Sequence, residues 1–87
     1  MTLEEIRQEI DQVDDAIVAL LEQRMNLVNR VVALKKLTGT AVLDSKREDA
    51  IFARVADKVE NKSYKETVVA TFSDILKRSR EFQNKNI

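Results

Sequence analysis

The N-terminal part of this chain carries ten heptad positions, alternately three and four residues apart, that constrain its fold more than any other feature. Nine of the ten are apolar, and we call the whole set the seam: Leu3, Ile6, Ile10, Val13, Ile17, Leu20, Arg24, Leu27, Val31 and Leu34. Residues at this spacing line one face of an α-helix, and such a stripe packs along another helix. The spacing therefore predicts one long helix whose apolar seam is interrupted by a single arginine.

Signals for both ends place this helix at about residues 3–36. Thr2 before two glutamates is typical of an N-cap, and Gly39 after Lys35 and Lys36 is typical of a C-terminus. The helix is roughly 50 Å long at 1.5 Å per residue, whereas a compact chain of this length has a diameter of about 30 Å. We therefore expect an obligate homodimer whose second chain covers the rest of the seam. A helix frayed at one end is the alternative.

The remaining sequence predicts a loop and two further helices. The loop covers residues 38–44, the second helix runs over about 45–60 and the third over about 64–84. Since no repeat or linker divides the chain, we expect an all-α fold with three helices in a single domain, residues 1–87.

Capping signals and apolar stripes support both of these helices. Asp44 or Ser45 is the expected N-cap of the second helix, and Ser63 with Glu66 forms a capping box for the third. The stripes consist of Ile51, Val55 and Val59 in the second helix and Val68, Val69, Phe72, Ile75, Leu76 and Phe82 in the third.

Composition excludes several classes of function. Fifteen basic residues balance fifteen acidic ones, whereas an electrostatic nucleic-acid binder usually carries a basic excess. The absence of cysteine and histidine removes disulfides, His/Cys metal sites and Ser-His nucleophilic catalysis. No apolar run approaches the roughly 20 residues that cross a bilayer, and the N-terminus is unlike a signal peptide. We expect a cytoplasmic protein without nucleic-acid, membrane or metal partners.

Eight polar residues lie on or beside the core-facing stripes. They are Arg7, Arg24 and Lys35 in the first helix, Asp44, Arg47 and Glu48 at the start of the second, and Ser79 and Gln83 in the third. Each has an ordinary structural explanation. The seam arginine can fix the register of a coiled coil, the lysine can reach solvent at a helix end, and the flanking arginine can simply be solvated. The acidic group can be a cap with local ion pairs, and the last two can mark a turn that leaves the core.

Taken together, these eight residues indicate a binding pocket. An unpaired buried charge is costly, so a cation in the seam needs an anionic partner. The four cations of the set exceed its two carboxylates by two, which suits a small dianion. Arginine holds a carboxylate in the plane of its fork. The pattern predicts a helical dimer with a cationic cluster in its core, and it leaves the ligand and the reaction open.

Five segments carry a resemblance to a known family: LEEIRQEID, LLEQR, VVALKK, LDSKRED and TFSDILKRSREFQ. In this order and spacing they resemble the all-helical chorismate mutases, in particular the small free-standing bacterial form, over essentially the whole chain. The resemblance implies an intertwined homodimeric helical bundle without a cofactor. It also implies an isomerase that converts chorismate to prephenate, a step of the shikimate pathway toward phenylalanine and tyrosine.

The resemblance further implies roles for the three cations of the first helix. Arg24 resembles the arginine that grips a substrate carboxylate. Lys35 resembles the lysine that contacts a carboxylate and the ether oxygen. Arg7 resembles the arginine that reaches into the site of the neighbouring subunit.

The other five residues also match positions of the family. Asp44 and Glu48 match the pair around the ring hydroxyl, where Glu48 accepts a hydrogen bond. Arg47 matches an arginine that supports carboxylate binding. Ser79 matches a polar contact near the ring carboxylate, and Gln83 matches the donor to the ether oxygen. The resemblance thus implies that Arg24, Lys35, Glu48 and Gln83 are catalytic and that all eight residues bind substrate.

Two other functions fit the sequence. One is an isochorismate pyruvate-lyase, which resembles the same fold and differs in its substrate and products. The other is a non-catalytic helical dimerisation module, in which the polar seam residues only fix the register.

Overall fold

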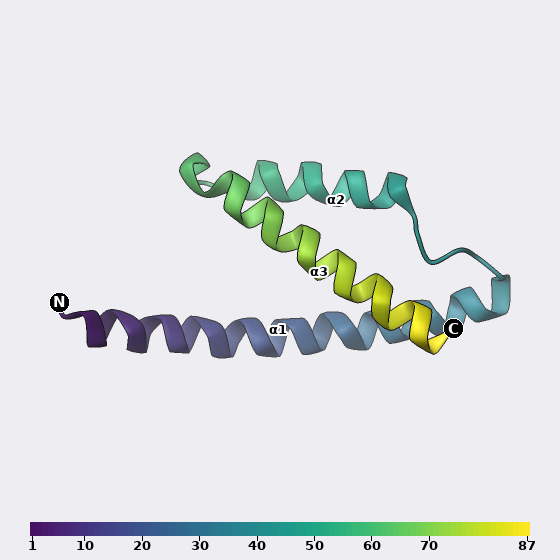
Figure 1. The fold of residues 1–87 in the computed structure, drawn as a ribbon, viewed down its shortest axis with the longest axis horizontal. Helices are drawn as coiled ribbons and strands as arrows, with labels where there is room; N and C mark the ends of the chain where they lie inside the picture. Colours follow the sequence, from purple (N-terminus) through teal and green to yellow (C-terminus); the bar gives the residue numbers. More distant parts are fainter.

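A computed structural model describes residues 1–87, and it contains three α-helices and one short 3-10 helix (Figure 1). The elements are α1, Leu3–Thr38; α2, Ser45–Lys58; η1, Lys62–Tyr64; and α3, Lys65–Asn86. This confirms the predicted all-α class with three helices. The chain is elongated, with a longest extent of 54 Å and a radius of gyration of 15.9 Å, compared with about 12 Å for a compact domain of this length. No helix is both long enough and apolar enough to span a membrane.

Side-chain and glycine caps end α1 where the sequence predicted caps. The Thr2 hydroxyl accepts a hydrogen bond from the backbone N–H of Glu5 at 3.2 Å. At the other end Gly39 adopts the left-handed conformation with φ of 69°, and its N–H donates to the Lys35 carbonyl. Glycine enters this region without a Cβ penalty. The helix therefore continues to Thr38, two residues beyond the predicted end.

The two ends of α2 are stabilised by side chains on either side of it. The Asp44 carboxylate accepts from the backbone N–H of Arg47 at 3.0 Å, so Asp44 is the N-cap. The Lys62 ammonium donates to the carbonyls of Ala56 and Asp57 in the last turn. A cation at this position satisfies free carbonyls and favours the negative end of the helix dipole.

The predicted capping box at the start of the third helix is wrong. Ser63 lies inside η1, and α3 begins at Lys65 without a side-chain cap. The side-chain carbonyl of Asn61 accepts from both the N–H and the hydroxyl of Ser63, at 3.1 and 2.6 Å. Ser63 does not cap α3 because it lies inside η1, one residue before the N-cap position, Tyr64.

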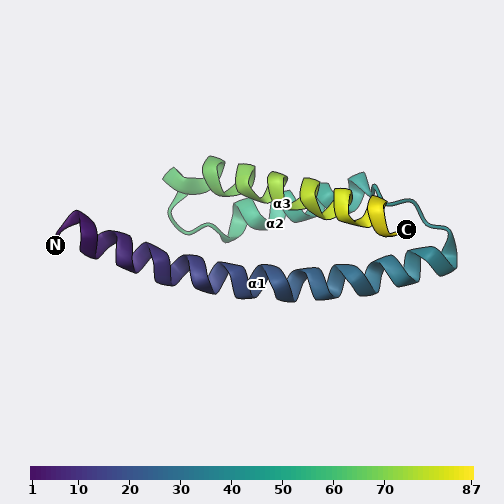
Figure 2. The same cartoon turned by 60° about the horizontal axis from the view of Figure 1, so that its bottom comes forward.

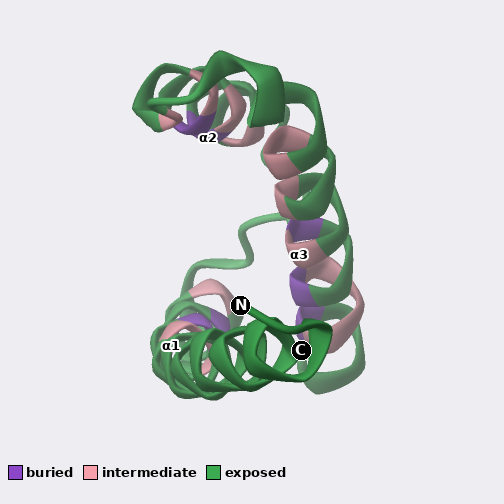
Figure 3. Cartoon of the chain, turned by 90° about the vertical axis from the view of Figure 1, so that its left-hand side faces the viewer, coloured by how far each residue is buried: buried purple, intermediate pink, exposed green.

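Helix α3 holds the chain together. It contacts both α1 and α2, whereas α1 and α2 do not contact each other, as the view along α1 shows (Figure 3). Ile51 and Val55 of α2 pack with Leu76 of α3 in a small core. Val28 and Val32 are the buried residues of α1. The first turns of α1 project beyond the other two helices in two views (Figures 1 and 2).

The seam does not pack against the chain's own helices. Its nine apolar side chains remain between 41% and 63% exposed. The face that meets α3 instead runs through Arg24, Val28, Val32 and Lys35, which are buried or partly buried. Arg24 therefore belongs to two stripes of α1: the exposed seam and the face that packs on its own chain.

Candidate active site

The structure brings seven of the eight predicted site residues to one pocket of about 270 Å³. The pocket lies between the C-terminal half of α1, the loop before α2, the first turns of α2 and the last turns of α3. Its lining consists of Arg24, Val28, Val31, Lys35, Val42, Asp44, Arg47, Glu48, Ile51, Leu76, Ser79, Arg80 and Gln83. Arg7 is the residue left out, since it lies on the exposed N-terminal half of α1.

Lys35, Gln83 and Ser79 form a chain of hydrogen bonds in this pocket. The Lys35 ammonium donates to the Val42 carbonyl at 2.9 Å and to Gln83 Oε1 at 3.0 Å. Gln83 Nε2 donates to Ser79 Oγ at 3.2 Å, and both of these side chains are buried. An ammonium has three donors and an amide nitrogen has two. One N–H of Lys35 and one of Gln83 therefore stay available to a ligand. Because the Gln83 oxygen accepts from Lys35, the Gln83 nitrogen is the atom that can donate to the ligand.

Arg24 lacks the partner that a buried cation requires. Its Nη1 is buried and makes no hydrogen bond. The pKa of Arg24 is lowered, first by burial and then by repulsion from Arg47 and Arg54. An arginine keeps its charge at neutral pH even so, and a buried charge without a counter-charge is unfavourable. The position therefore favours an anion.

Asp44 and Arg47 stand at the mouth of the pocket, where α2 begins. One carboxylate oxygen of Asp44 is used by the backbone cap of α2, and both residues are exposed. The N-cap position thus holds this carboxylate beside the pocket by a local hydrogen bond that the sequence pattern predicts.

Glu48 is held by a residue that the sequence analysis missed, Arg80. Arg80 Nη1 donates to both carboxylate oxygens of Glu48, at 2.5 and 2.6 Å, and joins α2 to α3 across 32 residues of sequence. One signal for Arg80 was present in the sequence. It lies four residues after Leu76 and three before Gln83, which is the spacing of one helix face.

The charges that line the pocket leave it cationic. Arg24, Lys35, Arg47 and Arg80 are opposed by Asp44 and Glu48, so the formal excess is two positive charges. The lining offers hydrogen-bond donors and carboxylate acceptors. Such a pocket can bind a small dicarboxylate, hold its conformation and stabilise negative charge that develops on it.

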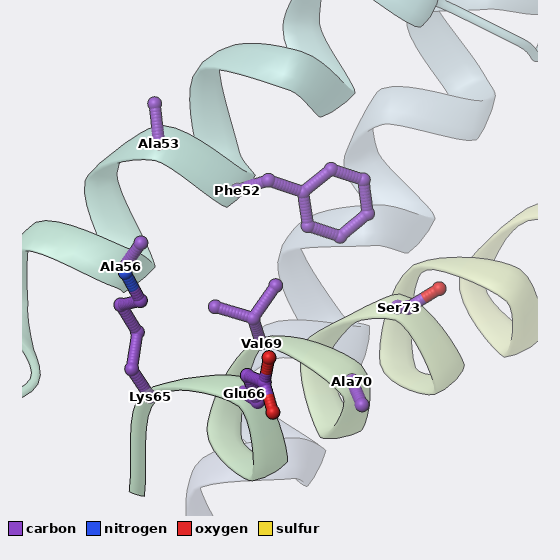
Figure 4. A pocket seen from close by; sticks show the side chains of 8 residues that line it. All are labelled: Phe52, Ala53, Ala56, Lys65, Glu66, Val69, Ala70 and Ser73. Atoms are coloured by element: carbon purple, nitrogen blue, oxygen red, sulfur yellow. The ribbon is translucent and has the colours of Figure 1, made fainter. Parts of the chain in front are cut away.

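A larger hollow, of about 630 Å³, lies between α2 and α3 and shares no residue with this pocket. Figure 4 shows Phe52 of α2 and Val69 of α3 between the two helices, with Lys65 and Glu66 near one end. Its lining carries one lysine against one glutamate, so it has no excess charge to hold an anion. The cationic pocket is therefore the candidate site despite its smaller volume.

Comparisons with known proteins relate the whole chain to one family. Residues 6–84 match the model of a family described as chorismate mutase type II. A chorismate mutase from Methanocaldococcus jannaschii is 28% identical over 93 residues, which cover 97% of this chain and 94% of that protein. No solved structure matches the chain.

Proposed function

The chain belongs to the chorismate mutase type II family, and we propose that the cationic pocket is the site at which it rearranges chorismate to prephenate. Its activity is that of a chorismate mutase, an isomerase that acts on a dicarboxylate. The proposal for the site rests above all on Arg24. Arg24 lines a pocket with two excess positive charges and its Nη1 is buried without a hydrogen bond, so in our proposal a carboxylate of the substrate supplies the missing partner.

Binding in this pocket restricts a flexible substrate to its reactive shape. The rearrangement forms a carbon–carbon bond while an ether C–O bond breaks, so the enolpyruvyl chain must lie over the ring. Arg24 and Arg47 hold carboxylates in our proposal, with Ser79 near the ring carboxylate. Fixing both ends of the substrate converts an improbable conformer into the bound one, which lowers the entropic part of the barrier.

Lys35 and Gln83 stabilise the charge that develops during the reaction. Negative charge grows on the ether oxygen as its bond breaks, and each residue keeps one N–H free of its partners in the chain. Donors that are oriented before the reaction stabilise this charge without reorganisation, and each contributes about 3 kcal/mol on the scale of an oxyanion hole. Both donors are held by one another and by Ser79, which supports this role.

Glu48 accepts the hydrogen bond of the ring hydroxyl in our proposal, and Asp44 lies beside it. Both carboxylates line the pocket on the side of α2. The oxygens of Asp44 and Glu48 can accept a hydrogen bond from a substrate hydroxyl, whereas they repel a substrate carboxylate at this position. This polarity gives the dicarboxylate substrate one orientation.

We propose that the protein is a homodimer, because a second chain would cover the exposed apolar side chains of the seam. Nine large apolar side chains are exposed along one face of α1, interrupted only by Arg24, and such apolar stripes are typical of interfaces. Leu27, Val31 and Leu34 continue this stripe beside the pocket, so a second α1 on the seam also comes close to the site.

An antiparallel pairing of the two α1 helices supports the donation of Arg7 to the partner's site. The midpoint of the seam lies between Val18 and Ala19, so two-fold pairing places Arg7 opposite Arg30 of the other chain. This level is roughly 9 Å along the axis from Arg24 and roughly 8 Å from Lys35. A parallel pairing would leave Arg7 roughly 26 Å from the level of Arg24.

An ultraviolet assay of chorismate loss, with the product identified, tests the proposed site. We expect the purified protein to form prephenate from chorismate, and an Arg24→Leu variant to lose this activity while it remains folded. The formation of salicylate and pyruvate from isochorismate, without prephenate from chorismate, would instead identify a pyruvate-lyase.

A further inference from the structure

Arg80 makes an ion pair inside the pocket that none of the other pocket cations makes. Its Nη1 bonds both oxygens of Glu48, and the two side chains are only 30% and 19% exposed. Arg24, Lys35 and Arg47 have no carboxylate partner. Charge-assisted hydrogen bonds that are shielded from water are stronger than those at the surface. Arg80 is therefore bound to a protein carboxylate in the site, while the other three cations remain available to a substrate.

The contact with Arg80 leaves Glu48 able to accept another hydrogen bond. A carboxylate has about four acceptor sites on its two oxygens, and Arg80 occupies one on each oxygen. The contact of Arg80 Nη1 with both oxygens opposes rotation of the carboxylate, so it favours one direction for the free sites. The positive charge of Arg80 also balances the Glu48 charge, which would otherwise repel an incoming dicarboxylate.

We propose that Arg80 is a positioning residue for the rearrangement: it holds the Glu48 carboxylate in the orientation that accepts the substrate hydroxyl and screens its charge from the dianion. This inference rests on the proposed function in assigning Glu48 to the hydroxyl. Arg80 acts through Glu48 and not by touching the substrate. Its effect must therefore disappear when Glu48 no longer carries a carboxylate.

A double-mutant cycle tests this dependence. We expect Arg80→Met to lower kcat/KM by about 10- to 100-fold, the size of effect that follows misplacement of a site group. Arg80→Lys should recover part of the loss, since an ammonium still bonds a carboxylate. In a Glu48→Gln background, Arg80→Met should change kcat/KM by no more than about twofold. Equal losses in both backgrounds would show that Arg80 acts on the substrate itself, and no loss in either would remove its role.

Arg78→Met is the matched control for these variants. Arg78 lies on the same helix and pairs with Glu81 at 3.0 Å, but its side chain is 75% exposed. We expect it to leave kcat/KM unchanged.

Thermal unfolding of each variant shows whether Arg80 merely joins α2 to α3. If kcat/KM at a temperature where every variant is folded is the same for Arg80→Met as for wild type, the positioning role is rejected.

Two bicyclic dicarboxylate mimics of the transition state, which differ only in the ring hydroxyl, provide a binding test. Their binding distinguishes a failure of the positioning role of Arg80 from a failure of the proposed function. We expect Arg80→Met to weaken the hydroxylated mimic more than the other, as measured by titration calorimetry, even where turnover is too slow to follow. A smaller weakening of both mimics is expected from the unscreened Glu48 charge. Equal weakening of both mimics overturns the positioning role. Independently, a Glu48→Gln variant that binds both mimics as wild type does contradicts the proposed role of Glu48.

Discussion

The two halves of α1 share one heptad pattern but differ in what surrounds them. Every residue up to Gln23 is exposed, whereas Arg24, Met25, Val28, Val32 and Lys35 are buried or partly buried against the chain's own helices. The C-terminal half carries the pocket, and the N-terminal half carries Arg7 and an uncovered apolar stripe. The period of a helix predicts that a face is buried, but it does not say which chain covers it. Substitutions in either half of α1 can therefore test this division.

Replacing Arg24 by leucine should remove the feature that makes the C-terminal half a site. We expect kcat/KM to fall by about 10³-fold, because the main carboxylate contact is lost. The free energy of unfolding should stay the same or rise by about 1 kcal/mol, since a poorly solvated cation is replaced by an apolar side chain. Chorismate assays and chemical denaturation measure the two effects. A variant with full activity would disprove the site assignment, and a variant that fails to fold would disprove the stability argument.

A charge placed on the seam in the N-terminal half of α1 should disrupt the proposed dimer interface. We expect Ile10→Asp to dissociate the dimer and to lower kcat/KM by at least about 100-fold, because a buried carboxylate at the seam is unfavourable and the partner's Arg7 is lost. Sedimentation velocity and circular dichroism follow assembly and helix content. Gln8→Asp, on the opposite face of the same turns, is the control and should remain dimeric. If Ile10→Asp stays dimeric, the seam is not the interface.

Gln83→Ala should separate catalysis from assembly. We expect kcat to fall by about 100-fold while KM changes by less than about threefold, because this donor strengthens its bond as charge develops on the ether oxygen. Steady-state kinetics measure both constants, and sedimentation should show an unchanged dimer. An equal change in kcat and KM, with dimerisation intact, would argue against a donor that acts in the transition state.

Mixing two inactive variants should show that each site uses both halves of α1. In an Arg7→Ala and Arg24→Ala mixture, heterodimers hold one site in which both arginines are intact. Random exchange makes about half of the dimers heterodimers, so about a quarter of the wild-type sites should recover. Differently tagged chains verify the exchange. If activity does not return although the chains have exchanged, each site is built from a single chain.

Local signals allowed most of the fold to be predicted from the sequence. Thr2, Gly39 and Asp44 cap their helices as expected, because caps depend on a few neighbouring residues. Seven of the predicted site residues line one pocket because they share helix faces that α3 brings together. The capping box predicted for α3 was wrong because a short 3-10 helix precedes α3 and includes Ser63, so this residue does not occupy the N-cap position.

Arg80 and the exposure of the C-terminal part of the seam were not predictable in the same way. The contact with Glu48 depends on how α2 and α3 cross, and the two residues are 32 positions apart. The seam was predicted as a packing face, but the chain's own helices meet α1 along Val28 and Val32 instead. Two stripes less than a turn apart look alike in a sequence, and only the tertiary arrangement separates them.

The uncovered N-terminal half of α1 has a consequence for the kinetics of folding. Helix formation is cooperative, and most helices depend on packing for their stability. A segment that meets none of its own chain cannot gain this packing in a unimolecular step. If the chain is the homodimer that we propose, the last phase of refolding should therefore be second order, with a half-time that falls in inverse proportion to protein concentration. Since the chain has no proline, no slow prolyl isomerisation competes with this phase, and the proposed dimer should fold only as fast as its chains associate.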